Sequence, residues 1–538
     1  MSIKKLNISK SLTNKFIIFI LYKKERLTLK NLKIYKNLDI IRNLKLNLVK
    51  TISPIFIVAT ISVINTIAFR EFAVGEINKE YNEIISPDVK TEELIIEEVI
   101  EEKVEVPKPP LMTAEEINKE ISHLGKITLE GMPGAEYDEA INREWIKIKP
   151  EGKFEFLDID LKKVMNYNKV EEYLLNMAKY DGVNLFSIGK TVQGRNIYMV
   201  EVVLPKEGET KEERDKRPTI MITGNIHARE GAGCEFSIKN LNDTLKESFT
   251  DPYKRELLKN VRITFVPLAN PDGRETIING GNPSRKSNGI GVDFQRNFPA
   301  INGGQQAIGI PKLRYMVGIP GIEFFPGPYL GSEEETKALI SWMEKYVPIA
   351  SYYIDLHQQG NIIYYEKMFL DKNMDKLSKS ASLSISAMLN NQYSLYVQRD
   401  DYGVDGGGGT PTDYARGIAE GMTFSYKYGR QVMIIDGKET LLVDFKDIDK
   451  VKEHNKPVNP NFTTMTVEIG SGPAYTGYGD YSLTLRNNLY FQQNWNNFLK
   501  NISEKTLGIE KVDILKKQLE EEKDVESMYA INGGKTKY

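Results

Sequence analysis

Disulfide bonds cannot support this fold, because only one cysteine, Cys234, occurs among the 538 residues. An exported protein without disulfides depends on packing, hydrogen bonds and bound metal for its stability. An excess of charge of one sign is also absent, since 72 Lys and Arg against 74 Asp and Glu give a formal net charge of −2. That balance argues against a nucleic-acid-binding protein. A run of four glycines at 406–409 lacks the Lys-Ser/Thr of a phosphate-binding loop, which argues against nucleotide binding.

Long uncharged runs are rare, and the clearest one is Thr51–Phe69. It is close to the roughly 20 residues needed to span a membrane. The first 50 residues hold 13 Lys and Arg against 2 acidic residues, whereas Val74–Val106 holds 11 acidic residues against 3 Lys. Because positive flanks stay in the cytoplasm, we expect the chain after Arg70 to lie outside. The run is interpreted as an uncleaved anchor, a signal peptide cut after Ala68, or a buried core helix.

The sequence predicts six regions along the chain. They are a basic segment (1–50), an anchor or signal segment (51–69), an acidic linker that ends in prolines (70–110), a pre-domain segment (111–160), a catalytic domain (161–503) and a charged tail (504–538). The linker composition favours an extended spacer. One helix is expected in the tail, over Val512–Glu522.

Helix and strand patterns alternate in the predicted catalytic domain, which indicates an α/β fold with a mixed, largely parallel central sheet flanked by helices. A Gly-containing turn is expected at Leu185–Thr191. Strands are expected at Ile197–Leu204, Thr219–Thr223, Val261–Pro267 and Ala350–Leu356, and helices at Val170–Lys179, after Glu230 to about Leu245, and at Glu333–Tyr346.

Histidine is scarce, with four in the chain, and two of them follow predicted strands directly. His227 and Glu230 form a His-x-x-Glu pair after one strand, and His357 ends another. Two histidines and a glutamate are a ligand set of catalytic zinc with a fourth position open to water. Alone, the pair is a weak signal, and a helix start whose glutamate is stabilised by the helix dipole explains it better.

Six motifs in a fixed order strengthen the metal interpretation, and with them the chain resembles the zinc carboxypeptidases of the M14 metallopeptidase family. The resemblance covers roughly residues 161–501. The motifs are Gly189–Arg195, His227–Glu230, Asn270–Gly273, Gly291–Phe298, His357 and Thr464–Glu468.

The resemblance implies one Zn²⁺ per chain, held by His227, Glu230 and His357. It implies that Glu468 is the general base that takes a proton from metal-activated water. Asp293 would support the His227 ring from behind, as a carboxylate commonly does for a zinc-bound histidine. Arg285 would stabilise the oxyanion of the tetrahedral intermediate.

Substrate binding is where the sequence departs from the family. Arg296 matches the arginine that grips the C-terminal carboxylate of the substrate, but Gln295 stands before it where the family commonly has Asn. Tyr402 is the best match to the mobile substrate-contacting tyrosine, and Thr412 lies near the position that sorts side chains by polarity. The stretch 426–459 is an insertion before the strand that ends at Glu468.

These inferences predict a zinc exopeptidase at the outer face of a cell membrane, or secreted if residues 51–69 are cleaved. Its substrates would be the C-terminal residues of peptides or of cell-wall stem peptides. Two alternatives stay open: a zinc amide hydrolase or deacylase acting on a non-peptide or internal bond, and a non-catalytic surface module that binds peptide ends.

Overall fold

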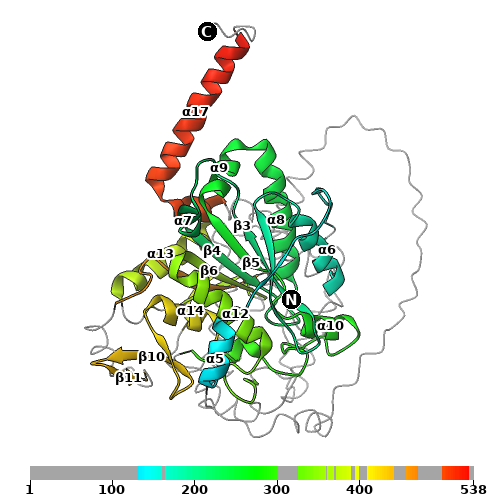
Figure 1. The fold of residues 1–538 in the computed structure, drawn as a ribbon, viewed down its shortest axis with the longest axis vertical. Helices are drawn as coiled ribbons and strands as arrows, with labels where there is room; N and C mark the ends of the chain where they lie inside the picture. The colour runs from blue at the N-terminus through cyan, green and yellow to red at the C-terminus, as the bar shows by residue number, and fades with distance from the viewer. Residues whose placement is uncertain are drawn as a thin grey trace, which may run out of the picture. The chain divides into compact units, whose positions relative to one another are not determined.

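The computed structural model describes residues 131–159, 161, 164–300, 325–358, 360–366, 368, 371–388, 394–398, 409–441, 456–469 and 500–531. All of them belong to one compact unit within residues 106–538 (Figure 1). The predicted segments 1–50, 51–69 and 70–110, and Tyr402 in the substrate loop, lie outside the described residues. Within the described part, no helix is long and apolar enough to cross a membrane.

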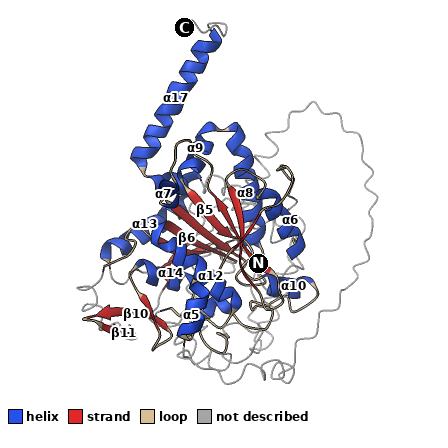
Figure 2. Ribbon diagram, viewed as in Figure 1, coloured by secondary structure: helices blue, strands red, loops and turns tan. Residues whose placement is uncertain are grey.

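A nine-stranded sheet forms the centre of the described unit, with helices on both sides (Figure 2). Its order is β1-β2-β3-β5-β4-β6-β12-β7-β8. The strands are β1 (Ile146–Ile148), β2 (Val183–Lys190), β3 (Asn196–Val202), β4 (Thr219–Gly224), β5 (Arg262–Val266), β6 (Ala350–His357), β7 (Ile362–Glu366), β8 (Ser394–Gln398) and β12 (Thr463–Glu468).

Parallel pairing lies in the middle of this sheet, where β5, β4, β6 and β12 run side by side in one direction. Strands β1, β2 and β3 extend one side by antiparallel pairing. On the other side, β7 is antiparallel to β12 and parallel to β8. The mixed α/β sheet expected from the sequence is therefore confirmed, with its parallel part in the central strands.

Helices cover both faces because alternate residues of each buried strand point to opposite sides. In β4, Ile220 and Ile222 join the core cluster beneath α6, α8 and α9, whereas Met221 joins the one beneath α12 and α14. The helices are α5 (Gly134–Ile141), α6 (Tyr167–Met177), α7 (Lys211–Asp215), α8 (Ala232–Thr250), α9 (Pro252–Asn260), α10 (Pro271–Ile278), α12 (Glu334–Tyr346), α13 (Lys372–Met388), α14 (Pro411–Ala419) and α17 (Ile509–Ile531), with 3₁₀ turns η3 (Phe294–Arg296) and η4 (Val347–Ile349).

One local prediction is wrong: Leu185–Thr191 is mostly strand β2 and not a turn. The pairing of β2 with β3 shifts register between Ser187 and Gly189, so the glycine marks a bulge. A Cβ on Gly189 would lie 2.9 Å from the Cβ of Ala338 on α12, closer than ordinary contacts allow. The glycine is needed for close packing of a helix on the strand, and the turn follows at 191–195, where Gly194 has φ +81°. The other strands and helices expected in the domain are confirmed, β3, β4, β5 and β6 together with α6, α8 and α12.

Two regions that the sequence placed outside the main pattern also contribute structure. Residues 131–159, predicted as part of a pre-domain segment, supply α5 and the edge strand β1. The predicted insertion 426–459 holds most of a small sheet of β9 (Thr423–Ser425), β10 (Arg430–Ile435) and β11 (Lys438–Thr440). In the tail, α17 includes the expected helix Val512–Glu522, and Val512 is buried in the core.

The central strands β4, β6 and β12 run parallel, so their carboxyl ends lie at the same edge of the sheet. Open α/β sheets bind ligands at this edge. His227 follows β4 by a short loop, His357 is the last residue of β6, and Glu468 is the last residue of β12. The sheet therefore brings together residues that are up to 241 positions apart (468 minus 227).

Candidate metal centre

The loop after β4 shapes the first two candidate ligands. Asn225 adopts φ +56°, a left-handed conformation that asparagine tolerates better than most residues. Its side-chain amide donates hydrogen bonds to the carbonyl oxygens of His227 and Ala228. The amide of Glu230 donates to the carbonyl oxygen of His227, which closes the turn. His227 and Glu230 consequently point toward the same space, with His227 Nδ1 2.9 Å from Glu230 Oε1.

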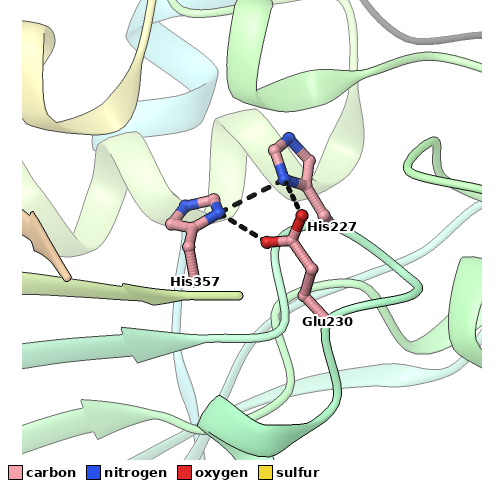
Figure 3. Close-up of side chains that lie close together, drawn as sticks. All are labelled: His227, Glu230 and His357. Atoms are coloured by element: carbon pink, nitrogen blue, oxygen red, sulfur yellow. Dashed lines mark hydrogen bonds and ion pairs between the residues drawn. The ribbon is translucent and has the colours of Figure 1, made fainter. Parts of the chain in front are cut away.

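His357 completes the group from the neighbouring strand (Figure 3). Its Nδ1 atom lies 2.8 Å from Glu230 Oε2 and 3.2 Å from His227 Nδ1. All three residues are at most 3 % exposed. Three ligand-type side chains from two strand ends therefore converge in a buried pocket.

The three side chains fit a zinc ion. Tetrahedral zinc with bonds of about 2.0–2.1 Å keeps its ligand atoms roughly 3.3 Å apart. The ligand atoms here are 2.8, 2.9 and 3.2 Å apart, which is slightly closer. Two imidazole nitrogens and a carboxylate are also the donor types that zinc prefers. A small outward movement of the ligands would accommodate the metal.

The electrostatics of the group show how strongly it favours positive charge. Burial raises the pKa of Glu230, but the two histidines outweigh that effect and hold its pKa well below the usual range. Burial lowers the pKa of His357, but Asp355 and Glu230 outweigh it and hold its pKa well above the usual range. A divalent cation bound here would supply the positive charge that protons on the histidines otherwise provide.

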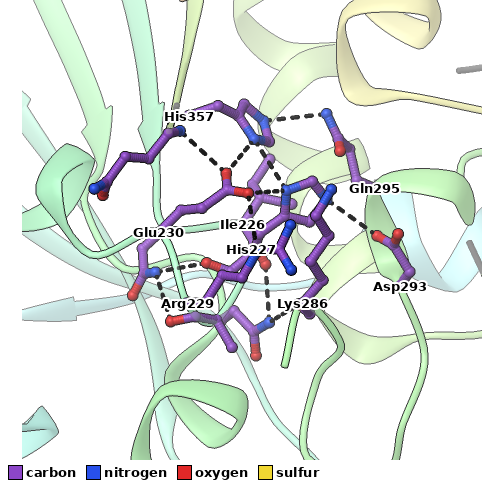
Figure 4. Close-up of polar contacts among 12 residues, drawn as sticks. Ile226, His227, Arg229, Glu230, Lys286, Asp293, Gln295 and His357 are labelled. Atoms are coloured by element: carbon purple, nitrogen blue, oxygen red, sulfur yellow. Dashed lines mark hydrogen bonds and ion pairs between the residues drawn. The ribbon is translucent and has the colours of Figure 1, made fainter. Parts of the chain in front are cut away.

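Each histidine has a carboxylate behind it. Asp293 Oδ1 lies 3.3 Å from Nε2 of His227, as the sequence predicted (Figure 4). Burial raises the pKa of Asp293, but the charge of His227 outweighs it, so the net pKa is low and the group is ionised. Asp355 Oδ2 lies 2.8 Å from Nε2 of His357, a contact that the sequence analysis missed. A signal was present, because residues two apart on a strand face the same side.

Glu468 ends β12 in register with His357 on β6. Adjacent strands are about 4.8 Å apart, so the carboxylate begins next to the metal ligands. Its Oε2 atom is buried and accepts no hydrogen bond from the described residues. Burial and the negative charge of Glu230 raise the pKa of Glu468 to about 7. A carboxylate with a pKa in this range can both take and return a proton near neutral pH.

The predicted substrate arginines lie on two loops beside this pocket. Arg285 is buried, and its Nε and Nη2 atoms donate to the carbonyl oxygen of Asn288 at 3.0 and 2.6 Å. Arg296 is buried on the η3 turn, and its backbone amide donates to the carbonyl of Asp293. The positive charge of Lys286, which the sequence analysis did not single out, favours the ionised forms of Asp293 and Glu468, although burial and the charge of Glu230 outweigh it at Glu468.

Asn270 and Asp272, from a predicted motif, support the site from outside it. The Asn270 amide donates to the carbonyl oxygens of Ile226, Lys286 and Ser287, which joins the zinc-ligand loop to the arginine loop. Asp272 accepts hydrogen bonds from Thr191, Gln193 and Arg195, the first of the predicted motifs. These two motifs therefore stabilise loops and do not reach the metal pocket.

A buried ion pair lies under the same loop. Arg274 donates to Asn225 Oδ1 at 3.0 Å and to the carbonyl of Met165 at 2.8 Å, and it also pairs with Glu235 on α8. Arg274 and Glu235 are fully buried. Because Asn225 holds the carbonyls of His227 and Ala228, this pair fixes the backbone from which the first ligand extends.

Comparisons with known proteins agree with this geometry. The family model described as zinc carboxypeptidase matches residues 170–455, more than half of the chain. The catalytic chain of human carboxypeptidase N is 34 % identical over 127 residues, which is 22 % of this chain and 26 % of the relative. Rat carboxypeptidase B is 25 % identical over 279 residues, 48 % of this chain and 63 % of the relative. The matches thus cover less than two thirds of these two relatives.

Among solved structures, thrombin activatable fibrinolysis inhibitor is similar with a TM-score of 0.44 and 15 % identity, over 65 % of this chain and 76 % of that one. This likeness is too distant to bear on function. The family match does bear on it, because it spans the loops that carry all three ligands. The chain therefore belongs to the zinc carboxypeptidase family, with zinc as the metal of its His227, Glu230 and His357 set.

Proposed function

We propose that this protein is a zinc-dependent exopeptidase that removes C-terminal residues from peptides. The observation that carries the proposal is the position of Glu468, which lies in register with the ligand His357 and has one buried carboxylate oxygen and a raised pKa. Zinc would activate a water molecule for attack on the scissile carbonyl. Glu468 would take the proton of that water and deliver it to the departing amine.

Cations beside the pocket support an exopeptidase over an endopeptidase. Arg296 is buried on the turn that follows Asp293, and Asp293 contacts the candidate ligand His227. A planar guanidinium binds a carboxylate through two parallel hydrogen bonds. We assign Arg296 to the C-terminal carboxylate of the substrate and Arg285 to the oxyanion of the intermediate.

A matched pair of substrates tests this assignment. Peptides with a free C-terminal carboxylate and the same peptides with an amidated end are incubated with the zinc-loaded protein, and released residues are identified. We expect hydrolysis of the free peptides only, and a large rise in KM with Arg296→Ala. Equal cleavage of both forms would show that the terminal carboxylate is not recognised.

A zinc amide hydrolase acting on a non-peptide or internal bond is the second candidate. One contact favours it. The Gln295 amide lies 3.1 Å from the ring nitrogen of His357, so it is placed to contact His357 and not the terminal carboxylate of a substrate. The same panel therefore includes internal amides and cell-wall stem peptides. Tight binding without any product at saturating zinc would instead indicate a non-catalytic binding module.

We also propose that residues 51–69 place the catalytic unit outside the cell, as an anchor or as a cleaved signal. The proposal depends on the sequence alone, on its uncharged run between basic and acidic flanks. N-terminal sequencing of the natural protein and protease treatment of intact cells test it. A start near Phe69 in the medium indicates a cleaved signal, and recovery in the cytosol with Met1 intact contradicts export.

A further inference from the structure

The imidazole of His357 has two nitrogen edges with different surroundings. Nδ1 faces the ligands Glu230 and His227. Nε2 faces away from them, and two side chains contact it. Asp355 Oδ2 lies 2.8 Å from it. The Gln295 amide lies 3.1 Å from it (Figure 4). The outer edge of this ligand is therefore contacted by groups from two separate parts of the chain.

Asp355 is held rigidly where it meets the ring. It lies two residues before His357 on β6 and is fully buried. Its other oxygen, Oδ1, accepts a hydrogen bond of 2.6 Å from the Thr223 hydroxyl, and that hydroxyl lies 3.0 Å from the hydroxyl of Tyr353. Thr223 is the register partner of Asp355 on β4. Two paired strands thus fix the carboxylate.

Gln295 approaches the same nitrogen from the η3 turn. The side chain is 6 % exposed. The turn is fixed by the Arg296 amide, which donates to the Asp293 carbonyl, and by the Phe298 amide, which donates to the carbonyl of Gly409. An asparagine at this position would be shorter by one methylene and would not reach as far toward the ring.

The proton arrangement follows from the metal position. With zinc on Nδ1, the ring proton is on Nε2 and is donated to Asp355. The ring has one Nε2–H, so Asp355 is its main acceptor; the Gln295 amide can share that proton only as a second acceptor through Oε1, which requires a half-turn that exchanges its oxygen and nitrogen. Groups that accept this proton fix the ring orientation and make Nδ1 a stronger ligand.

We propose that Asp355 and Gln295 are positioning residues for the zinc ligand His357, and that Gln295 is not part of the anchor for the substrate carboxylate. Asp355 contacts the Nε2 edge of the ring from β6, and Gln295 contacts the same edge from η3. Carboxylate recognition then belongs to Arg296 without help from its neighbour. The positioning of His357 rests on the zinc ligand set alone, whereas the statement about the carboxylate anchor rests on the proposed exopeptidase function.

Zinc affinity, measured by competition with a chromophoric chelator, tests the proposal without any substrate. We expect the zinc dissociation constant to rise about 10–100-fold in Asp355→Ala and less in Asp355→Asn, which keeps an acceptor but loses the charge. Gln295→Ala and the shorter Gln295→Asn should also weaken zinc binding. Gln295→Glu keeps an oxygen at the same reach and should restore it.

Two matched controls separate positioning from general loss of a buried group. Glu344 accepts hydrogen bonds from two tyrosine hydroxyls, and Gln431 is a buried glutamine that donates to a backbone carbonyl; among the described residues, neither is hydrogen-bonded to a histidine. Glu344→Gln and Gln431→Ala should leave zinc affinity unchanged. Thermal unfolding of each zinc-free variant checks that the fold is retained, and Asp355→Asn serves if Asp355→Ala does not fold.

Steady-state kinetics on a free-carboxylate peptide then distinguish the two roles of Gln295. A positioning role predicts that Gln295→Ala lowers kcat at subsaturating zinc and leaves KM near its original value. Unchanged zinc affinity with a raised KM would overturn the proposal for Gln295 and return it to the carboxylate anchor. Unchanged zinc affinity in both Asp355 variants would overturn the proposal for Asp355.

Discussion

The protein buries two groups of charges close to the same loop, and they differ in how their charges are matched. In the metal pocket, one carboxylate oxygen of Glu230 faces Nδ1 of His227 and the other faces Nδ1 of His357. Beneath the loop, Arg274 donates to an amide oxygen, a backbone carbonyl and the Glu235 carboxylate. The first group needs a cation from outside the chain, and the second carries its own.

The two groups therefore have different roles: the first binds a metal, and the second fixes the loop backbone. A buried ion pair that supplies its own counter-charge gains little over apolar packing, but removing one partner is costly because a charge is left unpaired. A pocket of converging acceptors is costly to keep empty and gains free energy when a cation enters it. Arg274 therefore fixes a loop whose other end is built to hold a metal.

The largest effect should come from removing a ligand. His357→Ala leaves two ligand side chains, so zinc content and hydrolysis should both fall to background. Metal analysis and a peptide assay measure this. Chelation of zinc from the wild-type protein should likewise abolish activity and lower the melting temperature, because the metal stabilises only the folded state. Retention of stoichiometric zinc by His357→Ala would show that the metal lies elsewhere.

Glu468→Gln should affect rate without affecting metal. The amide cannot take a proton, so we expect turnover to fall roughly 10²–10⁴-fold at unchanged zinc content. Single-turnover kinetics with metal analysis on the same sample measure both quantities. Near-normal turnover would move the general base to another group.

Arg274→Met should destabilise the fold by about 3–5 kcal/mol, because it leaves Glu235 buried and uncompensated. The double variant Arg274→Met with Glu235→Leu should recover most of that loss, since neither charge remains. Urea unfolding of the two variants measures the difference. No comparable double variant would restore the metal pocket. If the Arg274/Glu235 double variant is as unstable as Arg274→Met alone, the two groups of charges do not differ in the way described.

The smallest effect concerns Glu335, a fully buried glutamate on α12. Burial and the charge of Glu333 raise its pKa to about 8. The folded protein therefore keeps a proton that the unfolded chain releases near pH 4.5, and stability falls as pH rises from about 5 to 8. One pKa unit corresponds to about 1.4 kcal/mol, so a loss of at least that size is expected across the range.

Glu335→Gln removes this titration and should flatten the dependence. Denaturant unfolding of wild type and variant at pH 5 and pH 8 measures it. A wild-type protein equally stable at both values, or a variant with the same slope, would contradict the assignment.

The sequence was informative where chemistry and periodicity agreed. His227 and His357 could be identified because each follows an apolar run, and the sheet places the ends of β4 and β6 side by side. Asp293 was predicted as the support for His227, and its carboxylate lies 3.3 Å from the His227 ring. The mixed sheet followed from alternating helix and strand patterns.

The remainder depended on contacts that a linear pattern does not contain. In the sequence, Asp355 is one polar residue in a predicted buried strand, and only the structure shows its contact with the ring of His357. Gly189 reads as a turn signal, whereas the packing of α12 on β2 is what requires it. The reach of Gln295 to His357 depends on the separation of η3 and β6, which no spacing in the sequence specifies.

The pairing of His357 with Glu468 also has a consequence for engineering. Their separation is set by two adjacent strands in register, whatever the length of chain between them. New sequence can therefore enter this interval without rebuilding the reaction centre. The turn between β10 and β11 is a suitable entry point, since Asp436 and Gly437 both adopt positive φ, as a tight hairpin requires. A peptide-binding module grafted there would give the enzyme a new choice of targets while leaving its chemistry intact.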